Sequence, residues 1–271
     1  MSQELARFRA AKAQEIELLR QTPPRLDLGA MAANRLHRPE TSAFLASLRR
    51  ARQSRGLAII AEYKRASPSL GDIDLELSPT AAAASYEAAD AISVLTEETF
   101  FKGSLSFLET LALAGKPLLR KDFIFDPLQV SATALTKAAA ILLIVRLTPE
   151  PELLTKLVEQ AWLLNLEPVV EVFGPRDLAL ARDSGARIIL VNSRDLETLR
   201  VDLDGPLKLI KNFPPQPQEL WIAASGLKTA EDLARARAAG FGAVLLGSAL
   251  MGAKDSKMAL NALIEDFNNL N

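Results

Sequence analysis

A regular alternation of short apolar runs with helical stretches constrains the fold of this chain more than any other feature. The apolar runs are too short for helices. They are almost continuously apolar, as strands of a parallel sheet are when both faces of the sheet are buried. We therefore expect strands at 57–61, 91–95, 117–119, 141–145, 168–172, 188–191, 220–223 and 243–246.

The stretches between these runs have helical periodicity and begin with helix start signals. Ser78-Pro79, Asp126-Pro127 and Thr148-Pro149 each place an N-cap residue before a proline at the first helical position. Thr229 begins a capping-box sequence, and Gly240 falls where a helix C-cap belongs. One strand and one helix therefore alternate along most of the chain.

Eight strand–helix units predict a (β/α)8 TIM barrel of the α/β class. We expect one domain over 1–271, with residues 1–55 as an N-terminal helical extension. Residues 3–20 should form an amphipathic helix with Leu5, Phe8, Ile16 and Leu19 on one face. Lys12 falls on that face too, so we expect this imperfect apolar face to be only partly buried. The alternative, a doubly wound open sheet, needs a glycine-rich loop after the first strand, and Ser67-Pro68-Ser69 is not such a loop.

Composition narrows the possible functions. Lys and Arg number 32 against 33 Asp and Glu, so the net charge of -1 provides no field that would attract nucleic acid or a membrane. The absence of cysteine excludes disulfides, thiolate metal sites and cysteine nucleophiles. The single histidine, His37, argues against a histidine-based zinc site or a Ser-His-Asp triad. The charged N-terminus has no secretory h-region, and no apolar stretch is long enough to span a membrane. A soluble, cytoplasmic protein is expected.

Polar residues gather where the expected strands end. Glu62 and Lys64 are two residues apart, so in a strand they share one face. A structural ion pair would explain this pair by itself, but polar residues also follow six of the other seven expected strands. These residues are Thr96, Glu97, Glu98, Arg120, Lys121, Asp122, Glu171, Asn192, Arg194, Asp195, Ser225, Gly226, Gly247 and Ser248. Because active sites of this barrel lie at the carboxyl ends of the strands, the recurrence indicates a catalytic rim.

The last two expected strands suggest a phosphate site. Ser225-Gly226 and Gly247-Ser248 follow them, at the position where such barrels commonly hold phosphate. Glycine allows backbone N–H groups to approach an anion closely, and helix N-termini add a favourable dipole. A Ser-Gly pair is often only a turn, but two of them at neighbouring strand ends favour a phosphorylated small-molecule ligand.

Taken together, the motifs resemble the indole-3-glycerol phosphate synthase family. The matching segments are 60–69, 94–101, 119–124, 170–172, 191–196, 224–227 and 246–251, in the order that the family has them. The resemblance implies ring closure of 1-(2-carboxyphenylamino)-1-deoxyribulose 5-phosphate, with loss of CO2 and water, in tryptophan biosynthesis. It implies no cofactor and no metal. We expect a monomer or a weak homodimer.

The resemblance also implies roles for the catalytic residues. Lys121 matches the general acid that polarises the carbonyl, and Lys64 matches the lysine that meets the substrate carboxylate. Glu62 matches the carboxylate that orients Lys64, and Glu171 matches the carboxylate that transfers protons during dehydration. Asn192 can hydrogen-bond the intermediate.

The remaining candidates would bind the substrate. Ser67, Ser225, Gly226, Gly247 and Ser248 match phosphate-site positions. Arg194 lies beside Asn192 and is a substrate-binding candidate. Phe101, Phe123 and Leu196 could line the aromatic pocket, although core packing explains these three equally well.

One position departs from the family pattern. The family usually has glutamate immediately before the Ser-Gly of the seventh strand, and here Ala224 stands in that place. This departure motivates a non-catalytic ligand-binding barrel, or a related enzyme with another sugar phosphate, as alternatives. A Schiff-base aldolase that uses Lys64 or Lys121 is a further alternative. Phosphoribosylanthranilate isomerase resembles the chain less, and its usual cysteine base is absent.

Overall fold

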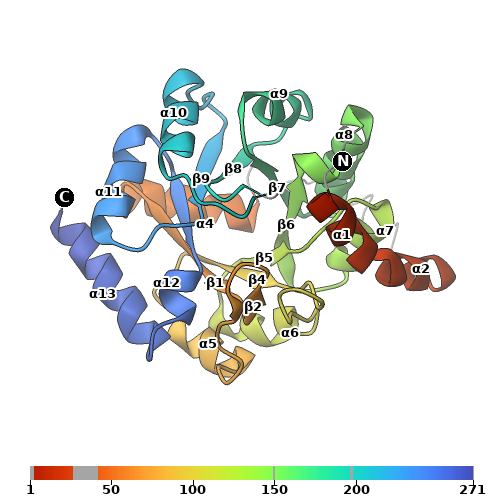
Figure 1. The fold of residues 1–271 in the computed structure, drawn as a ribbon, viewed down its shortest axis with the longest axis horizontal. Coiled ribbons are helices and arrows are strands. Elements are labelled where there is room, and N and C mark those ends of the chain that lie inside the picture. The colour runs from red at the N-terminus through yellow and green to blue at the C-terminus, as the bar shows by residue number, and fades with distance from the viewer. Residues whose placement is uncertain (1–2, 27–41, 149, 196–197, 271) are drawn as a thin grey trace.

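The computed structural model describes residues 3–26, 42–148, 150–195 and 198–270. Within them, eight parallel strands close into a barrel in the order β1, β10, β9, β8, β7, β6, β5 and β4, with β4 pairing with β1 (Figure 1). The strands are β1 (Ala58–Tyr63), β4 (Ala91–Leu95), β5 (Leu118–Lys121), β6 (Ala138–Ile144), β7 (Glu167–Val172), β8 (Ile188–Asn192), β9 (Leu220–Ala224) and β10 (Ala243–Leu246). The predicted TIM barrel is confirmed, and a doubly wound open sheet is excluded.

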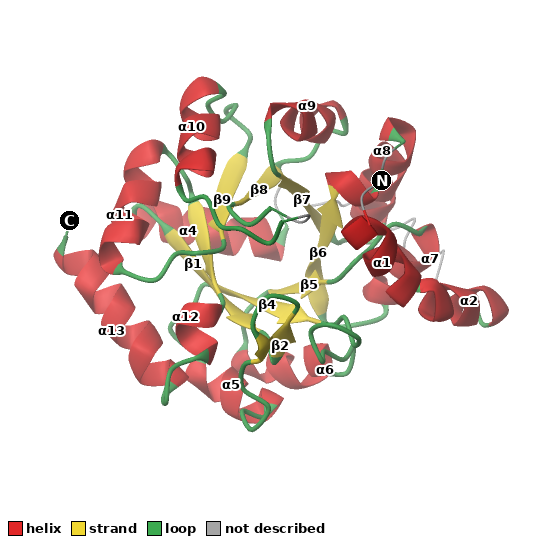
Figure 2. Cartoon of the chain, viewed as in Figure 1, coloured by secondary structure: helices red, strands yellow, loops and turns green. Residues whose placement is uncertain are grey.

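Helices surround the barrel and alternate with its strands (Figure 2). The helices that follow the eight strands in turn are α5 (Pro79–Ser85), α6 (Phe107–Leu111), α7 (Pro127–Ala134), α8 (Pro151–Leu163), α9 (Pro175–Asp183), α10 (Asp204–Asn212), α11 (Ala230–Ala239) and α13 (Ser256–Asn269). The shorter elements are the hairpin β2 (Ala66–Ser67) and β3 (Gly71–Asp72), the 3-10 turns η1 (Ala112–Ala114) and η2 (Val145–Leu147), and α12 (Ser248–Met251).

Most of the expected helix starts are confirmed. The Ser78 hydroxyl accepts a hydrogen bond from the Ala81 amide, while Asp126 and Thr229 each form a full capping box. Each cap binds backbone amides that the first turn of the helix leaves unpaired. These helix starts therefore depend only on residues a few positions apart in the sequence. The expected start at Thr148-Pro149 is wrong: α8 begins at Pro151 after Glu150, and Pro149 lies outside the described residues.

The strands are buried on both faces because they separate two apolar layers. Inside the barrel, side chains such as Ile60, Leu119 and Leu190 pack together. On the outer face, side chains such as Ile59 and Leu143 pack against the surrounding helices. Alternation along each strand assigns its residues to these two layers.

The helices before β1 divide between the two ends of the barrel. Helix α4 (Ala43–Arg55) packs against β1, β4 and β6, and its Leu48 belongs to the inner core. Helix α1 (Gln3–Ala11) lies near η2, where the Arg9 guanidinium donates to the Leu147 carbonyl at 2.7 Å. Figure 1 shows α4 behind the strands and α1 in front of them.

The N-terminal segment differs from the single amphipathic helix that was expected over 3–20. The chain forms α1 and then α2 (Ala13–Gln21), and the two helices meet at Lys12. On the expected apolar face, Leu5, Phe8, Lys12 and Ile16 are buried and Leu19 is partly buried, so the face is buried more fully than expected. Lys12 itself is only 4% exposed. Its burial is compensated by Glu15 on α2 and by Asp122 directly after β5, and sequence periodicity cannot reveal the second of these partners. No helix among the described residues is long and apolar enough to cross a membrane.

Candidate active site

A pocket opens at the carboxyl ends of the strands and brings the predicted site residues together. Its empty volume is about 1030 Å³, including open solvent at the mouth. The predicted residues that line it are Glu62, Lys64, Ser67, Phe101, Lys121, Phe123, Glu171, Asn192, Arg194, Ser225, Gly226, Gly247 and Ser248. Leu196, the remaining candidate, lies outside the described residues.

Strand alternation aims the charged side chains into this pocket. Ile60 and Leu119 face the barrel interior, so Glu62 and Lys121, two residues further along their strands, do so as well. The pattern repeats on β7 and β8, which carry Glu171 and Asn192. Each of these polar side chains follows the last inner apolar residue of its strand, at the end where the barrel opens to the pocket.

Glu62 joins the two candidate lysines. Its carboxylate lies 2.7 Å from Lys64 Nζ through Oε1 and 3.3 Å from Lys121 Nζ through Oε2. Burial alone would raise the pKa of this carboxyl, but the ammonium groups of Lys121 and Lys64 outweigh burial and lower the pKa to about 2. One ionised carboxylate therefore orients two ammonium groups towards the same pocket.

Lys121 and Glu171 have pKa values raised for different reasons. Burial alone would lower the pKa of Lys121, but the negative charges of Glu62 and Glu171 outweigh it and raise that pKa, which keeps the ammonium protonated. For Glu171, burial dominates and raises the pKa. Glu171 Oε1 accepts a hydrogen bond from Asn192 Nδ2 at 3.2 Å, while its buried Oε2 has no hydrogen-bond partner. The pocket thus contains an ammonium group that stays protonated, on Lys121, and a carboxyl group suited to exchanging protons, on Glu171.

Asn192 connects this carboxyl to the loop after β8. Its Oδ1 accepts a hydrogen bond from the Arg194 amide at 2.9 Å, while its Nδ2 donates to Glu171. The Arg194 guanidinium donates to the Leu199 carbonyl at 3.0 Å and lines the pocket. Both polar atoms of the Asn192 side chain therefore have partners, which holds the amide in one orientation.

An aromatic wall lies beside the charged groups. Phe101 and Phe123 both line the pocket, with ring centroids 6.0 Å apart. Phe8, from α1, also lines it and stacks on Phe123 at 4.3 Å. The sequence places Phe8 only on the apolar face of a helix, because periodicity indicates that a residue is buried but not what covers it.

Glu97 shapes the loop that carries Phe101. By sequence, Glu97 is only one of several polar residues that follow a strand. In the structure its side chain is buried. Its carboxylate accepts hydrogen bonds from the amides of Thr99, Phe100 and Phe101 at 2.7–3.1 Å. The sequence feature that could have indicated this loop-shaping role is an acidic residue just before a short loop, where its carboxylate can accept hydrogen bonds from backbone amides.

Backbone geometry distinguishes the two candidate phosphate turns. Ser225 and Gly226 have φ angles of 70° and 82°, so the chain after β9 makes two consecutive left-handed residues. At Gly247, a Cβ atom would lie 2.3 Å from Glu62 Oε1 and 3.0 Å from Lys64 Nζ. Glycine at 247 therefore leaves room for the Glu62–Lys64 pair, and any larger residue there would have to displace the Glu62 carboxylate.

Ala224 occupies a buried position on the pocket wall, opposite Asn192 in the pairing of β8 with β9. The methyl group adds no charge there. Glu62 and Glu171 are therefore the carboxylates that face Lys121 most directly, as their effects on its pKa indicate. Among the described residues, no group of three His, Asp or Glu side chains is arranged to hold a metal ion.

Comparisons with known proteins identify relatives of this chain. A family model described as indole-3-glycerol phosphate synthase matches residues 5–263. A protein of that name from Desulfosudis oleivorans is 39% identical over 267 residues, which cover 97% of this chain and 99% of the relative. Its namesake from Chlorobium phaeovibrioides is 44% identical over 206 residues, covering 74% of this chain and 79% of the relative.

Solved structures share the fold at lower identity. A 3-hexulose-6-phosphate synthase matches with a TM-score of 0.60 and 16% identity, over 79% of this chain and 99% of that chain. The corresponding protein from Salmonella typhimurium matches with a TM-score of 0.61 and 14% identity, over 79% of this chain and all of that chain. These likenesses concern the barrel alone.

Proposed function

This chain belongs to the indole-3-glycerol phosphate synthase family, and from that premise we propose how its residues divide the work of the reaction. The chain is a carboxy-lyase that converts 1-(2-carboxyphenylamino)-1-deoxyribulose 5-phosphate to indole-3-glycerol phosphate, CO2 and water. The non-catalytic barrel and the other enzymes considered above are not favoured.

Lys121 acts as the general acid of ring closure. The observation that carries this assignment is the Glu62 carboxylate, which bridges the Lys121 and Lys64 ammonium groups in one pocket. A proton from Lys121 polarises the ketone while the ring carbon that bears the carboxylate attacks the ketone carbon. Loss of CO2 then restores the aromatic ring. Lys64 meets the substrate carboxylate, and Glu62 orients both lysines.

Glu171 transfers protons in the dehydration that follows. The hydroxyl group leaves as water, and a proton leaves the neighbouring ring carbon. A carboxyl group whose pKa burial raises can exchange protons in this step more readily than one held fully ionised. Asn192 supports this role, since its amide donates to Glu171 and keeps Oε1 in place.

The substrate lies between an aromatic wall and a phosphate turn. Phe8, Phe101 and Phe123 pack against the anthranilate ring, and Arg194 contacts the polar part of the molecule. The phosphate binds at Ser67, Ser225, Gly226, Gly247 and Ser248, where left-handed turns and the start of α12 expose backbone amides.

The wider setting follows from the same premise. We expect a single domain over 1–271 with the extension at 1–55, working in the cytoplasm as a monomer or weak homodimer without a cofactor. Its partner is the phosphorylated small-molecule substrate. A net charge of -1 gives no basis for binding nucleic acid.

A turnover assay tests these roles. The purified protein is incubated with the substrate, and indole fluorescence is followed over time, with Lys121→Ala as the comparison. We expect turnover in the parent and a loss of about a thousandfold in kcat in the variant, since a positioned acid contributes roughly 10²–10⁴-fold. Saturable binding without turnover in the parent would contradict the proposed chemistry. A Lys121→Ala variant that keeps its rate would contradict the assignment of the acid.

A further inference from the structure

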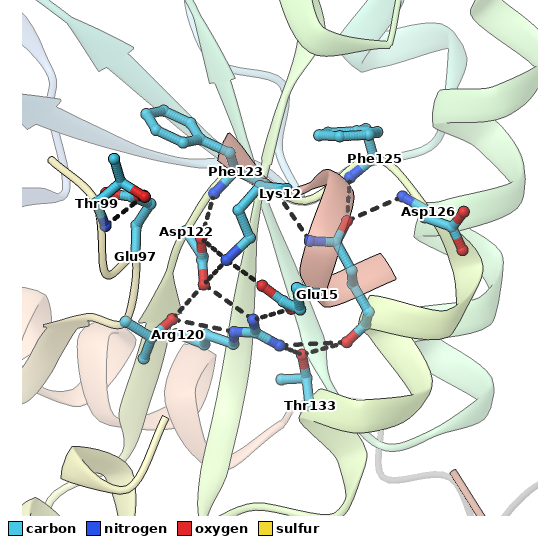
Figure 3. A network of polar contacts seen from close by, with 12 residues as sticks. Lys12, Glu15, Glu97, Thr99, Arg120, Asp122, Phe123, Phe125, Asp126 and Thr133 are labelled. Carbon is cyan, nitrogen blue, oxygen red and sulfur yellow. Dashed lines mark hydrogen bonds and ion pairs between the residues drawn. The ribbon is translucent and has the colours of Figure 1, made fainter. Parts of the chain in front are cut away.

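A buried lysine joins the N-terminal helices to the strand that carries Lys121. Lys12 lies where α1 meets α2, and its ammonium reaches Asp122 Oδ1 at 2.9 Å and Oδ2 at 3.1 Å. It also pairs with Glu15 on α2. Figure 3 shows the Lys12 side chain extending between Asp122 and Glu15. The two ends of the Lys12–Asp122 contact are 110 residues apart in the chain.

Asp122, the residue directly after Lys121, is held from several sides. Its Oδ2 accepts hydrogen bonds from Thr96 Oγ1 at 2.6 Å and from Arg120 Nη2 at 2.9 Å, and its Oδ1 accepts from the Phe123 amide at 2.8 Å. Burial alone would raise the pKa of this carboxyl, but the charges of Arg120 and Lys12 outweigh burial and lower the pKa to about 2. The carboxylate therefore stays ionised, and Lys12 remains paired with it.

The extension contacts the same strand end at two further points. Arg120 Nη2 donates to Glu15 Oε1 at 3.1 Å, and Phe8 stacks on Phe123. Arg120 and Asp122 are two positions apart and pair with each other, while Lys121 between them reaches Glu62 inside the barrel. The extension therefore contacts residues on both sides of Lys121 in the chain, and the position of this backbone sets where the Lys121 ammonium reaches.

Stability alone is a poor explanation for this network. Buried ion pairs often stabilise a fold no more than apolar side chains of similar volume do, because removing two charges from water offsets their attraction. They do impose a defined geometry. The Lys121–Glu62 distance is 3.3 Å, so a small backbone displacement would separate the pair.

We propose that Lys12 is a positioning residue of the reaction, holding the end of β5 through Asp122 so that Lys121 reaches both Glu62 and the substrate. This proposal rests on the proposed role of Lys121 as the acid. Lys12, where α1 meets α2, then affects the chemical step as well as holding the N-terminal extension against the barrel.

Steady-state kinetics on Lys12→Met, Lys12→Arg and Arg9→Met test the proposal. Methionine keeps the length of the side chain without its charge, and Asp122 retains Arg120 and Thr96, so the variant should fold. We expect Lys12→Met to lower kcat about tenfold with KM within about twofold, since displacements near 1 Å can cost a hundredfold in rate. Lys12→Arg should return kcat to within about threefold of the parent.

Arg9→Met is the matched control because it removes another contact between α1 and the barrel, the bond to the Leu147 carbonyl. It should leave kcat within about twofold. Equal losses of kcat in Lys12→Met and Arg9→Met would overturn the proposal, as would a rise in KM alone. So would a loss of rate that follows the fraction of protein folded, measured by circular dichroism.

Amide hydrogen exchange separates this proposal from the proposed function, because it needs no substrate. In Lys12→Met, the segment 118–123 should exchange faster than in the parent, whereas Arg9→Met should leave that segment protected, since the ring that Arg9 contacts, Phe125, lies beyond it. If the parent shows no turnover but this difference appears, the assignment of the reaction fails while the structural link stands. Unchanged exchange in Lys12→Met would overturn the link itself.

Discussion

Strand β7 carries one buried glutamate at each end, and the two have different partners. At the amino end, Glu167 binds the Arg187 guanidinium through both of its oxygens, at 3.3 Å and 2.7 Å. At the carboxyl end, Glu171 accepts a hydrogen bond from Asn192 through Oε1 and leaves Oε2 without a hydrogen-bond partner. The same residue type is fully neutralised at one end of the strand and left available at the other.

The contrast extends around the barrel. At the amino end, Glu219 and Asp90 are also paired with arginines, Arg182 and Arg55. At the carboxyl end, the cations that meet Glu62 are lysines. Arginine keeps its charge and matches a carboxylate with a planar fork, whereas lysine can release a proton. The three amino-end carboxylates Glu167, Glu219 and Asp90 therefore have arginine partners, whereas Glu62 in the pocket has lysine partners that can take part in proton transfer.

Breaking an amino-end pair should give the largest effect, and on stability alone. Arg187→Met leaves the buried Glu167 carboxylate without its guanidinium, so the free energy of unfolding should fall by about 3 kcal/mol. The kcat of the folded fraction should stay within about twofold. Urea denaturation and steady-state kinetics measure the two quantities. Adding Glu167→Gln should recover part of the stability, and a large loss of kcat would contradict the separation of the two ends.

The acid dependence of stability should differ between Glu62 at the carboxyl end and Asp90 at the amino end. The pKa of Glu62 is lowered to about 2 by Lys121 and Lys64 despite burial, so its contribution is present above pH 4.5 and is lost as pH falls towards 2. Glu62→Gln should therefore reduce the acid-side fall in unfolding free energy by roughly 3 kcal/mol, as measured by denaturation between pH 2 and 7.

Asp90 provides the opposite case for the same experiment. Burial raises its pKa despite Arg55 and the Ile59 amide, so its contribution favours the folded state at low pH and is lost as pH rises. Asp90→Asn should make the acid-side fall slightly steeper. If the unfolding free energy depended on pH in the same way in Glu62→Gln and Asp90→Asn, the two carboxyl groups would not differ electrostatically as described.

A single methyl group at Gly247 should disturb the lysine pair. Its Cβ would overlap Glu62 Oε1, so Gly247→Ala must displace the carboxylate that orients Lys64 and Lys121. We expect kcat/KM to fall about tenfold, as measured by initial rates. Gly174→Ala is the control, since a Cβ at Gly174 meets nothing within 4 Å. If Gly247→Ala were as active as this control, the Glu62 carboxylate could move without lowering kcat/KM, which would contradict its orienting role.

The smallest effect is expected at Ala224. Ala224→Glu adds a carboxylate to a pocket that already holds Glu62 and Glu171. Because these two groups already face Lys121, we expect kcat/KM to change by less than about tenfold, and by less than in Lys121→Ala. Parallel rate measurements on the two variants test the order. A larger change in Ala224→Glu than in Lys121→Ala would contradict the assigned roles.

Much of the candidate site could be predicted because it depends on local geometry. The two-residue spacing of Glu62 and Lys64 and the polar residues after each apolar run required only strand alternation and the rule that barrel sites lie at carboxyl ends. The helix starts at Ser78, Asp126 and Thr229 were predictable for the same reason. Element ends were less certain: the strand expected at 141–145 is β6 at Ala138–Ile144, and α8 begins at Pro151.

The amino-acid sequence by itself determined the order of strands and helices, the side of each strand that faces the barrel interior, and the residue types at the pocket. Those properties follow from neighbours a few positions apart. Tertiary structure alone decided that Lys12 is buried against Asp122 and that Phe8 joins the pocket wall. It also decided that Glu62 serves two lysines at once. These contacts join distant segments, so their geometry exists only once the barrel has closed.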